Sequence, residues 1–225
     1  MNLRIVCASL VVATTCFGSQ VSLSPSNVIG GSGSYGGNWL TGTFNATSIF
    51  DQQTGPVSDN FGVSYWINPD DGPQNAYIVI DLGAAYHLSS LDFFNTHNSN
   101  FGDRGTGDFT IEAGNSITNL GAPGFDLTGP TVVILNGTLA AAPVADPINA
   151  QSFTLSDPGT YRYIKFEPHT VAAAGTPCCG ANVYGLNELR VFETPVTTDG
   201  SVPEPAPLAL LTSGLAAIAL LRRRA

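Results

Sequence analysis

The chain has 225 residues, enough for one domain of ordinary size with terminal signals, and its formal net charge is −9. Four of its eight basic residues, Arg4, Arg222, Arg223 and Arg224, lie near the two ends, so the central body is still more acidic and we expect no nucleic-acid partner. With 25 Gly, 15 Pro and few charges, the composition favours a β-rich exported protein.

Residues 1–18 are typical of a secretory signal peptide. One early Arg precedes the apolar run 5–13, and small residues follow it, with Cys16 and Gly18 at the −3 and −1 positions of a cleavage site. A lipoprotein anchor at Cys16 is disfavoured, because the three residues before it match the lipoprotein motif poorly. We therefore expect secretion across the inner membrane.

The body, residues 20–193, alternates short apolar runs with turn-forming residues. Residues 77–82 are β-branched and aromatic and stop at Gly83, which predicts one strand there and a separate strand at 88–94. The run 109–113 alternates apolar and polar residues, so one face packs inward. About eight or nine such runs predict an all-β sandwich or jelly roll. The further expected strands are residues 39–44, 131–135, 152–155, 161–167 and 186–193.

A polar loop, residues 95–108, separates two of these strands, and loops of this length in a compact domain tend to be functional. Sugars are bound by planar side chains under the apolar face of the ring and by amide or charged groups that bond the hydroxyls. Alternatively, Arg104 pairs with Asp103 or Asp108 and only fixes the loop, while Phe101 caps the core. The candidate carbohydrate-binding residues are His97, Asn98, Asn100, Phe101 and Arg104.

Several motifs in this order resemble the discoidin, or coagulation-factor C-type, domain of the galactose-binding-like superfamily. They are IDLG at 80–83, the Asn-rich loop ending in DRGTGDFTIE at 103–112, YRYIKFE at 161–167 and GLNELRVFE at 185–193. The resemblance covers about residues 45 to 193. It implies that the body is a jelly-roll β-sandwich.

The same resemblance implies a structural calcium ion. In that family an Asp and loop carbonyls hold Ca²⁺ together with a Glu from the last strand, which correspond here to Asp51 and Glu188. Ca²⁺ prefers six to eight hard oxygen ligands, and a loop of this composition can supply them. The sequence departs from the family at Gln52, where Gly is common. Without calcium, Asp51 is an ordinary turn residue that binds nearby amides.

Two adjacent cysteines, Cys178 and Cys179, remain after removal of the signal peptide. In an exported chain an even count suggests oxidation. A disulfide between neighbours forms a strained eight-membered ring. We favour it over two free thiols, bridges to another molecule, or a metal thiolate pair, which lacks further ligands at the usual spacing.

The C-terminal segment has three parts in order after the polar linker 194–201. The motif Pro203-Glu204-Pro205 comes first, the apolar run 208–221 follows, and Arg222, Arg223 and Arg224 end the segment. Residues 202–225 resemble the PEP-CTERM sorting signal, which an exosortase recognises. The resemblance implies cleavage near the Pro-Glu-Pro motif in a Gram-negative bacterium that makes exopolysaccharide.

The apolar run supports a transient membrane helix before cleavage. Fourteen residues rise about 21 Å as a helix, short of a bilayer core of roughly 30 Å unless flanking residues help. The Arg cluster belongs on the cytoplasmic side by the positive-inside rule. A permanent tail anchor fits the apolar run equally well but leaves the Pro-Glu-Pro motif unexplained.

No pattern in the chain indicates an enzyme. It has three histidines, and it lacks the Gly-x-Ser-x-Gly, His-Glu-x-x-His and phosphate-loop motifs. We therefore expect an exosortase-sorted protein of the cell surface or extracellular matrix whose β-sandwich binds a glycan or exopolysaccharide. The alternative is a structural or adhesive biofilm matrix protein without a defined ligand site.

Overall fold

The computed structural model describes residues 18–55, 65–69, 76–97, 102–177 and 182–194. Residues 1–17 of the expected signal peptide, Cys178 and Cys179, and the C-terminal segment from 195 onward lie outside the described residues, as do Asn98, Asn100 and Phe101. Within the described part no helix is long and apolar enough to span a membrane.

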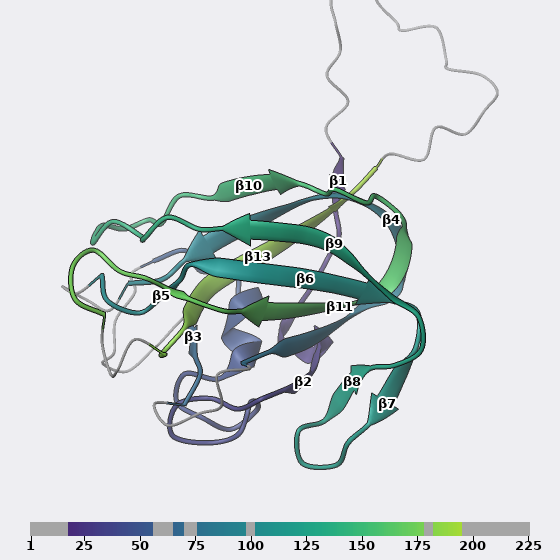
Figure 1. The fold of residues 1–225 in the computed structure, drawn as a ribbon, viewed down its shortest axis with the longest axis horizontal. Coiled ribbons are helices and arrows are strands. Elements are labelled where there is room, and N and C mark those ends of the chain that lie inside the picture. The colour runs from purple at the N-terminus through teal and green to yellow at the C-terminus, as the bar shows by residue number, and fades with distance from the viewer. Residues whose placement is uncertain (1–17, 56–64, 70–75, 98–101, 178–181, 195–225) are drawn as a thin grey trace, which may run out of the picture. The chain divides into compact units, whose positions relative to one another are not determined.

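The described chain is all-β, with two short 3₁₀ helices, as the sequence predicts (Figure 1). The elements are β1 Ser19–Gln20, η1 Pro25–Asn27, β2 Val28–Gly31, η2 Ala46–Phe50, β3 Trp66–Ile67, β4 Ile78–Asn95, β5 Gly105–Thr106, β6 Asp108–Gly114, β7 Ile117–Asn119, β8 Phe125–Leu127, β9 Thr131–Thr138, β10 Gln151–Thr154, β11 Thr160–Pro168, β12 Val171–Ala172 and β13 Gly185–Glu193.

The strands form a two-layer sandwich with antiparallel pairing throughout. In the first layer β10 pairs with β4, β4 with β13, and β13 with both β1 and β3. In the second layer the order is β2–β4–β11–β6–β9. Two small sheets, β12–β5 and β7–β8, complete the fold. The layered arrangement confirms the predicted jelly-roll sandwich.

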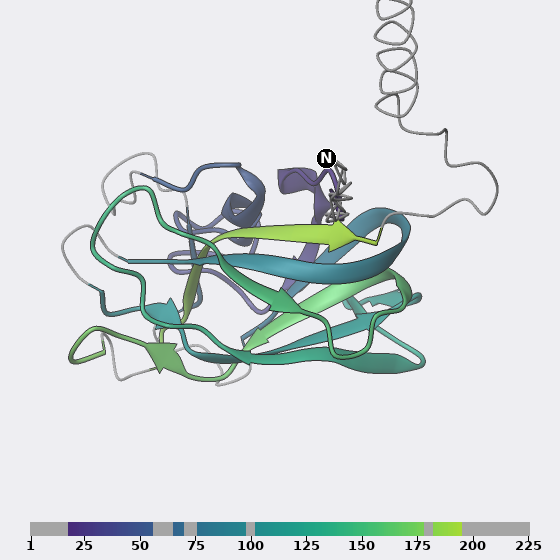
Figure 2. The same cartoon turned by 90° about the horizontal axis from the view of Figure 1, so that it is seen from above.

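Strand β4 belongs to both layers because it is long and bent. Its first part pairs with β11 and β2, and its last part, from Leu88 onward, pairs with β13 and β10. Figure 2 shows the strand curling from one layer into the other. At the bend Gly83 has a φ of +86°, and its N–H donates to the Asp81 carboxylate at 2.8 Å. The expected break at Gly83 is therefore a bend in one strand, since a residue free to take positive φ can redirect a strand without ending it.

The strand expected at residues 39–44 is not present. Residues 39–44 form turns and not a strand, because the side-chain Oδ1 of Asn38 accepts hydrogen bonds from the N–H groups of Leu40 and Thr41. A side chain that binds backbone amides two and three residues ahead favours a turn over an extended conformation. The strand that precedes η2 is β2, in the Gly-rich segment before Asn38.

The main core lies between the two layers and is rich in phenylalanine. The rings of Phe93, Phe109 and Phe166 lie 4.6 to 5.9 Å apart, and Phe153 packs edge-on against the first two. Each such ring, when fully buried, contributes about 1.5–3 kcal/mol to stability. These rings come from β4, β6, β10 and β11, so they hold the two layers together.

A second cluster covers part of the outer face of the first layer. Phe94 of β4 points away from the main core and packs with Phe44, Tyr65, Ile67 and Val183. The Arg190 guanidinium lies 4.5 Å from the centre of the Phe94 ring, at the boundary of this cluster. Beside this cluster the outer face carries a hollow lined by Ser90, Asp92, Ser152 and Phe192 among others.

Candidate functional site

The predicted sugar-binding loop is closed at its base by Asn95, which is fully buried at the end of β4. Its side chain accepts a hydrogen bond from the Thr106 N–H at 2.9 Å and donates to the Thr106 and Ala140 carbonyls, both at 2.8 Å. A Cβ on Gly105 would lie 2.8 Å from the Asn95 side chain, so only glycine fits there. Asn95 was not among the predicted residues; its place at the junction of strand and loop is the signal that indicates it.

Two of the five candidate loop residues are described. The His97 side chain is 2% exposed, and its Nε2 lies 3.3 Å from Oδ1 of Asp146. The Arg104 Nε donates to Asp103 at 2.9 Å, the pairing considered as the loop-fixing alternative. His97 therefore faces the interior of this region, and the Arg104–Asp103 pair lies at its surface.

Asp51 and Glu188 are brought together although 137 positions separate them in sequence. Asp51 caps the end of η2, and Glu188 points from β13 toward η2, fully buried. Burial and the nearby Asp51 carboxylate raise the pKa of Glu188 from its usual 4.5 to about 8. Burial also raises the pKa of Asp51. The two residues expected to hold calcium thus lie near each other, with Glu188 fully buried and Asp51 half-buried.

Gln52 holds the Glu188 carboxylate in place, while the Gln53 N–H donates to Asp51 at 2.8 Å. The Gln52 N–H donates to Glu188 at 3.2 Å and its side-chain amide donates to the other carboxylate oxygen at 3.0 Å. The φ of Gln52 is +64°, in the region that favours glycine, so the position keeps a backbone that Gly takes most easily. Sequence reasoning noted Gln52 only as a departure from the family and missed its two hydrogen bonds.

The pair was tested as a calcium site on its donor atoms and charge. In the described residues no group of three or more His, Cys, Asp or Glu could hold a metal. Calcium sites, however, also use amide and carbonyl oxygens. The Glu188 carboxylate is fully buried and the Asp51 carboxylate half-buried, and the pKa of each is raised although the Arg190 charge lowers that of Glu188. The two carboxylates are hard oxygen donors of the kind that a calcium site uses.

A shallow hollow of about 520 Å³ lies on the second layer, between β6 and β9 and beside His169. Its polar side chains bind one another. The Thr110 hydroxyl contacts Asn136 at 3.0 Å and His169 at 2.9 Å, and the Thr138 hydroxyl donates to Asp108 at 2.6 Å. Because these groups are mutually engaged, the hollow offers few of them to a ligand.

No family model and no curated protein matches this chain. Several solved structures match this chain in fold. A putative chitobiase fragment from Bacteroides thetaiotaomicron aligns with a TM-score of 0.52 at 18% identity, over 81% of this chain and 97% of that one. CBM32-3 from a family 31 glycoside hydrolase of Clostridium perfringens aligns at 0.50 and 13%, over 77% and 95%. The family 32 CBM of C. perfringens NanJ, solved with galactose, aligns at 0.49 and 16%, over 77% and 98%.

The body shares its jelly-roll β-sandwich fold with these structures. Since the identities are low, the comparison establishes the fold only.

Proposed function

We propose that this chain is an exported carbohydrate-binding protein. The observation that carries the proposal is the fold, because a jelly roll of this type is also the fold of CBM32-3, a carbohydrate-binding module of a glycoside hydrolase. Function does not follow from fold alone. The physical support is Asn95, whose buried side chain binds Thr106 and so joins the two ends of the polar loop.

The negative charge of the chain limits the class of glycan that it can bind. A formal net charge of −9 opposes polysaccharides that carry carboxylates or sulfates, because like charges repel during approach and at contact. We therefore propose an uncharged glycan or exopolysaccharide as partner.

We also propose export by the signal peptide at 1–18 and sorting by an exosortase that recognises residues 202–225. The support is the order of Pro-Glu-Pro motif, apolar run and Arg cluster, together with the position of the last strand. Strand β13 ends at Glu193, directly before the polar linker 194–201. The destination is then the cell surface or extracellular matrix of a Gram-negative bacterium, with the C-terminal segment as a transient membrane anchor.

A structural calcium ion held by Asp51 and Glu188 is the third part of the proposal. A divalent cation would favour the ionised form of Glu188, whose pKa burial and Asp51 raise, and its role would be to fix the end of η2 against β13.

The test is a glycan array followed by exopolysaccharide pull-down with the purified protein, with calcium and with chelator. We expect saturable binding to uncharged glycans that chelator weakens. Arg104→Ala, compared with Asn136→Ala in the unrelated β6–β9 hollow, then reports whether the loop contributes. A folded protein that binds no glycan in either condition would overturn the proposal in favour of a structural matrix protein.

A further inference from the structure

The uncovered part of the first layer's outer face is hollowed. Along β4, Leu91 and Phe93 point into the main core, so Ser90, Asp92 and Phe94 point outward. The second cluster covers Phe94. Beyond it lies a hollow of about 410 Å³, a size typical of small-ligand pockets.

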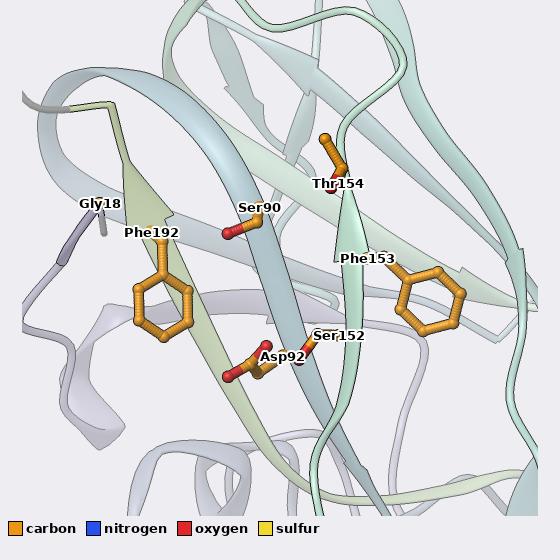
Figure 3. Close-up of a pocket in the computed structure, with 7 residues that line it drawn as sticks. All are labelled: Gly18, Ser90, Asp92, Ser152, Phe153, Thr154 and Phe192. Carbon is orange, nitrogen blue, oxygen red and sulfur yellow. The ribbon is translucent and has the colours of Figure 1, made fainter. Parts of the chain in front are cut away.

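Three strands supply its lining in two cross-strand rows. Ser152 of β10 and Arg190 of β13 are the register partners of Asp92 on either side. Thr154 and Phe192 flank Ser90 in the same way. Figure 3 shows Asp92 and Ser90 directed toward the Phe192 ring, with Ser152 and Thr154 on the neighbouring strand. Cross-strand neighbours lie about 4.5–5.5 Å apart, so the polar groups and the ring border one space.

The polar groups of this hollow are not used by the protein. Within the described ranges, the side chains of Ser90, Asp92, Ser152 and Thr154 make no hydrogen bond or ion pair, and residues 152 and 154 are exposed. The buried Nε of Arg190, at the end of the Asp92 row, also lacks a hydrogen-bond partner. The hollow between β6 and β9 is the opposite case, since its side chains bind one another.

We propose that this hollow is a second glycan-binding site, separate from the loop at residues 95–106, and that it takes an uncharged sugar unit. The proposal rests on the proposed carbohydrate-binding function. The half-buried Phe192 ring offers a face for the apolar side of a pyranose. The Asp92 carboxylate accepts hydrogen bonds from sugar hydroxyls, and the Ser and Thr hydroxyls donate or accept as needed. The carboxylate at the centre of the lining disfavours a uronate or sulfated sugar.

The experiment compares variants of the purified protein by titration calorimetry with a neutral galactan and with anionic alginate as probes. Ser152→Arg fills the hollow and removes no buried contact, because Ser152 is exposed. Ser152→Ala is its matched control, and Phe192→Ala removes the ring. We expect galactan affinity to fall about tenfold or more in Ser152→Arg and in Phe192→Ala, and to change less than about threefold in Ser152→Ala. Alginate should bind no variant at this site.

The outcomes separate the two proposals. Loss of binding in Ser152→Arg, with an unchanged unfolding temperature, supports the site even if Phe192→Ala fails to fold. Unaltered galactan affinity in Ser152→Arg overturns this site and leaves the carbohydrate-binding function intact. Absence of galactan and array binding by the unmodified protein overturns both. Alginate binding that Ser152→Arg abolishes would overturn the assignment of an uncharged ligand.

Discussion

Glu188 and Asp92 lie on neighbouring strands of the same layer, and both point away from the main core, yet their surroundings differ. Glu188 is covered by η2, fully buried and hydrogen-bonded twice by Gln52. Asp92 is half-buried in an open hollow, and its side chain has no partner in the described part of the chain. The role of a carboxylate on this sheet therefore depends on what covers its face. A covered one serves the fold, and an open one is available to a ligand.

Glu188 and Asp92 should differ most in how they affect the pH dependence of the free energy of unfolding, measured without calcium. The pKa of Glu188 is about 8 when folded and 4.5 ordinarily. Between these values the folded state binds more protons than the unfolded state, so the free energy of unfolding falls as pH rises. The stabilisation is complete below pH 4.5 and is lost as pH rises through 8. At about 1.4 kcal/mol per pKa unit, the loss is at most about 5 kcal/mol.

Urea unfolding at several pH values in chelator measures this loss. Glu188→Gln is the control, because it cannot ionise, and we expect it to flatten the profile over this range. A profile identical in the two proteins would contradict the raised pKa.

Truncation of Glu188 should have the next largest effect. Glu188→Ala leaves two Gln52 donors without an acceptor and opens space under η2, so we expect a loss of about 3 kcal/mol at pH 6. Glu112→Ala, at a half-exposed position of β6, should change stability by less than about 0.5 kcal/mol. Equal losses in the two variants would show that the covered carboxylate has no special role.

Calcium should give a comparable but smaller stabilisation. A single site saturated at about one hundred times its dissociation constant adds about 2.7 kcal/mol. We expect calcium to raise the unfolding temperature of the protein and to leave that of Glu188→Ala unchanged, as measured by calorimetry. If magnesium and calcium act alike on both proteins, the ion acts elsewhere.

Asp92→Asn should have the smallest effect on stability. Because its carboxylate is not hydrogen-bonded or paired within the described chain, we expect a change below about 0.5 kcal/mol in urea unfolding. A loss above about 1 kcal/mol would mean that Asp92 serves the fold, and the contrast with Glu188 would disappear.

Local patterns in the sequence were sufficient for several of the strands that lie wholly within one layer. The alternation of residues 109–113 correctly predicts β6, with Phe109, Ile111 and Ala113 buried. Strands β11 and β13 likewise fall within one residue of their expected ranges. In these strands every second residue meets the core, so period two is visible in the sequence.

The same patterns could not predict features that depend on distant parts of the chain. The bend in β4 exists because the strand crosses between layers, and Gly83 by itself indicates only a break. The β7–β8 hairpin, in a segment where no strand was expected, has its Asp126 paired with Lys165 of β11 at 3.1 Å. The local sequence reveals neither that β4 crosses between the layers nor that Asp126 pairs with Lys165.

The candidate sites also depend on contacts between distant parts of the chain. Asp51 and Glu188 were paired by resemblance and not by spacing, since no local pattern joins positions so far apart. The hollow at Asp92 needs the register of β10, β4 and β13 together, because its lining residues are single side chains from three strands. A one-residue slip of any strand would turn its contribution inward.

The antiparallel pairing of β1 with β13 places Ser19 directly opposite Glu193, so the two ends of the folded body leave the sandwich side by side. The loop closed by Asn95 touches the other end of β13, where the Thr106 hydroxyl donates to the Gly185 carbonyl. Strand residues advance about 3.3 Å each, which puts that loop roughly 26 Å from the chain ends. A tether at either chain end would therefore attach to the same end of the sandwich. It would present the loop outward and keep the Asp92 hollow closer to the anchoring surface.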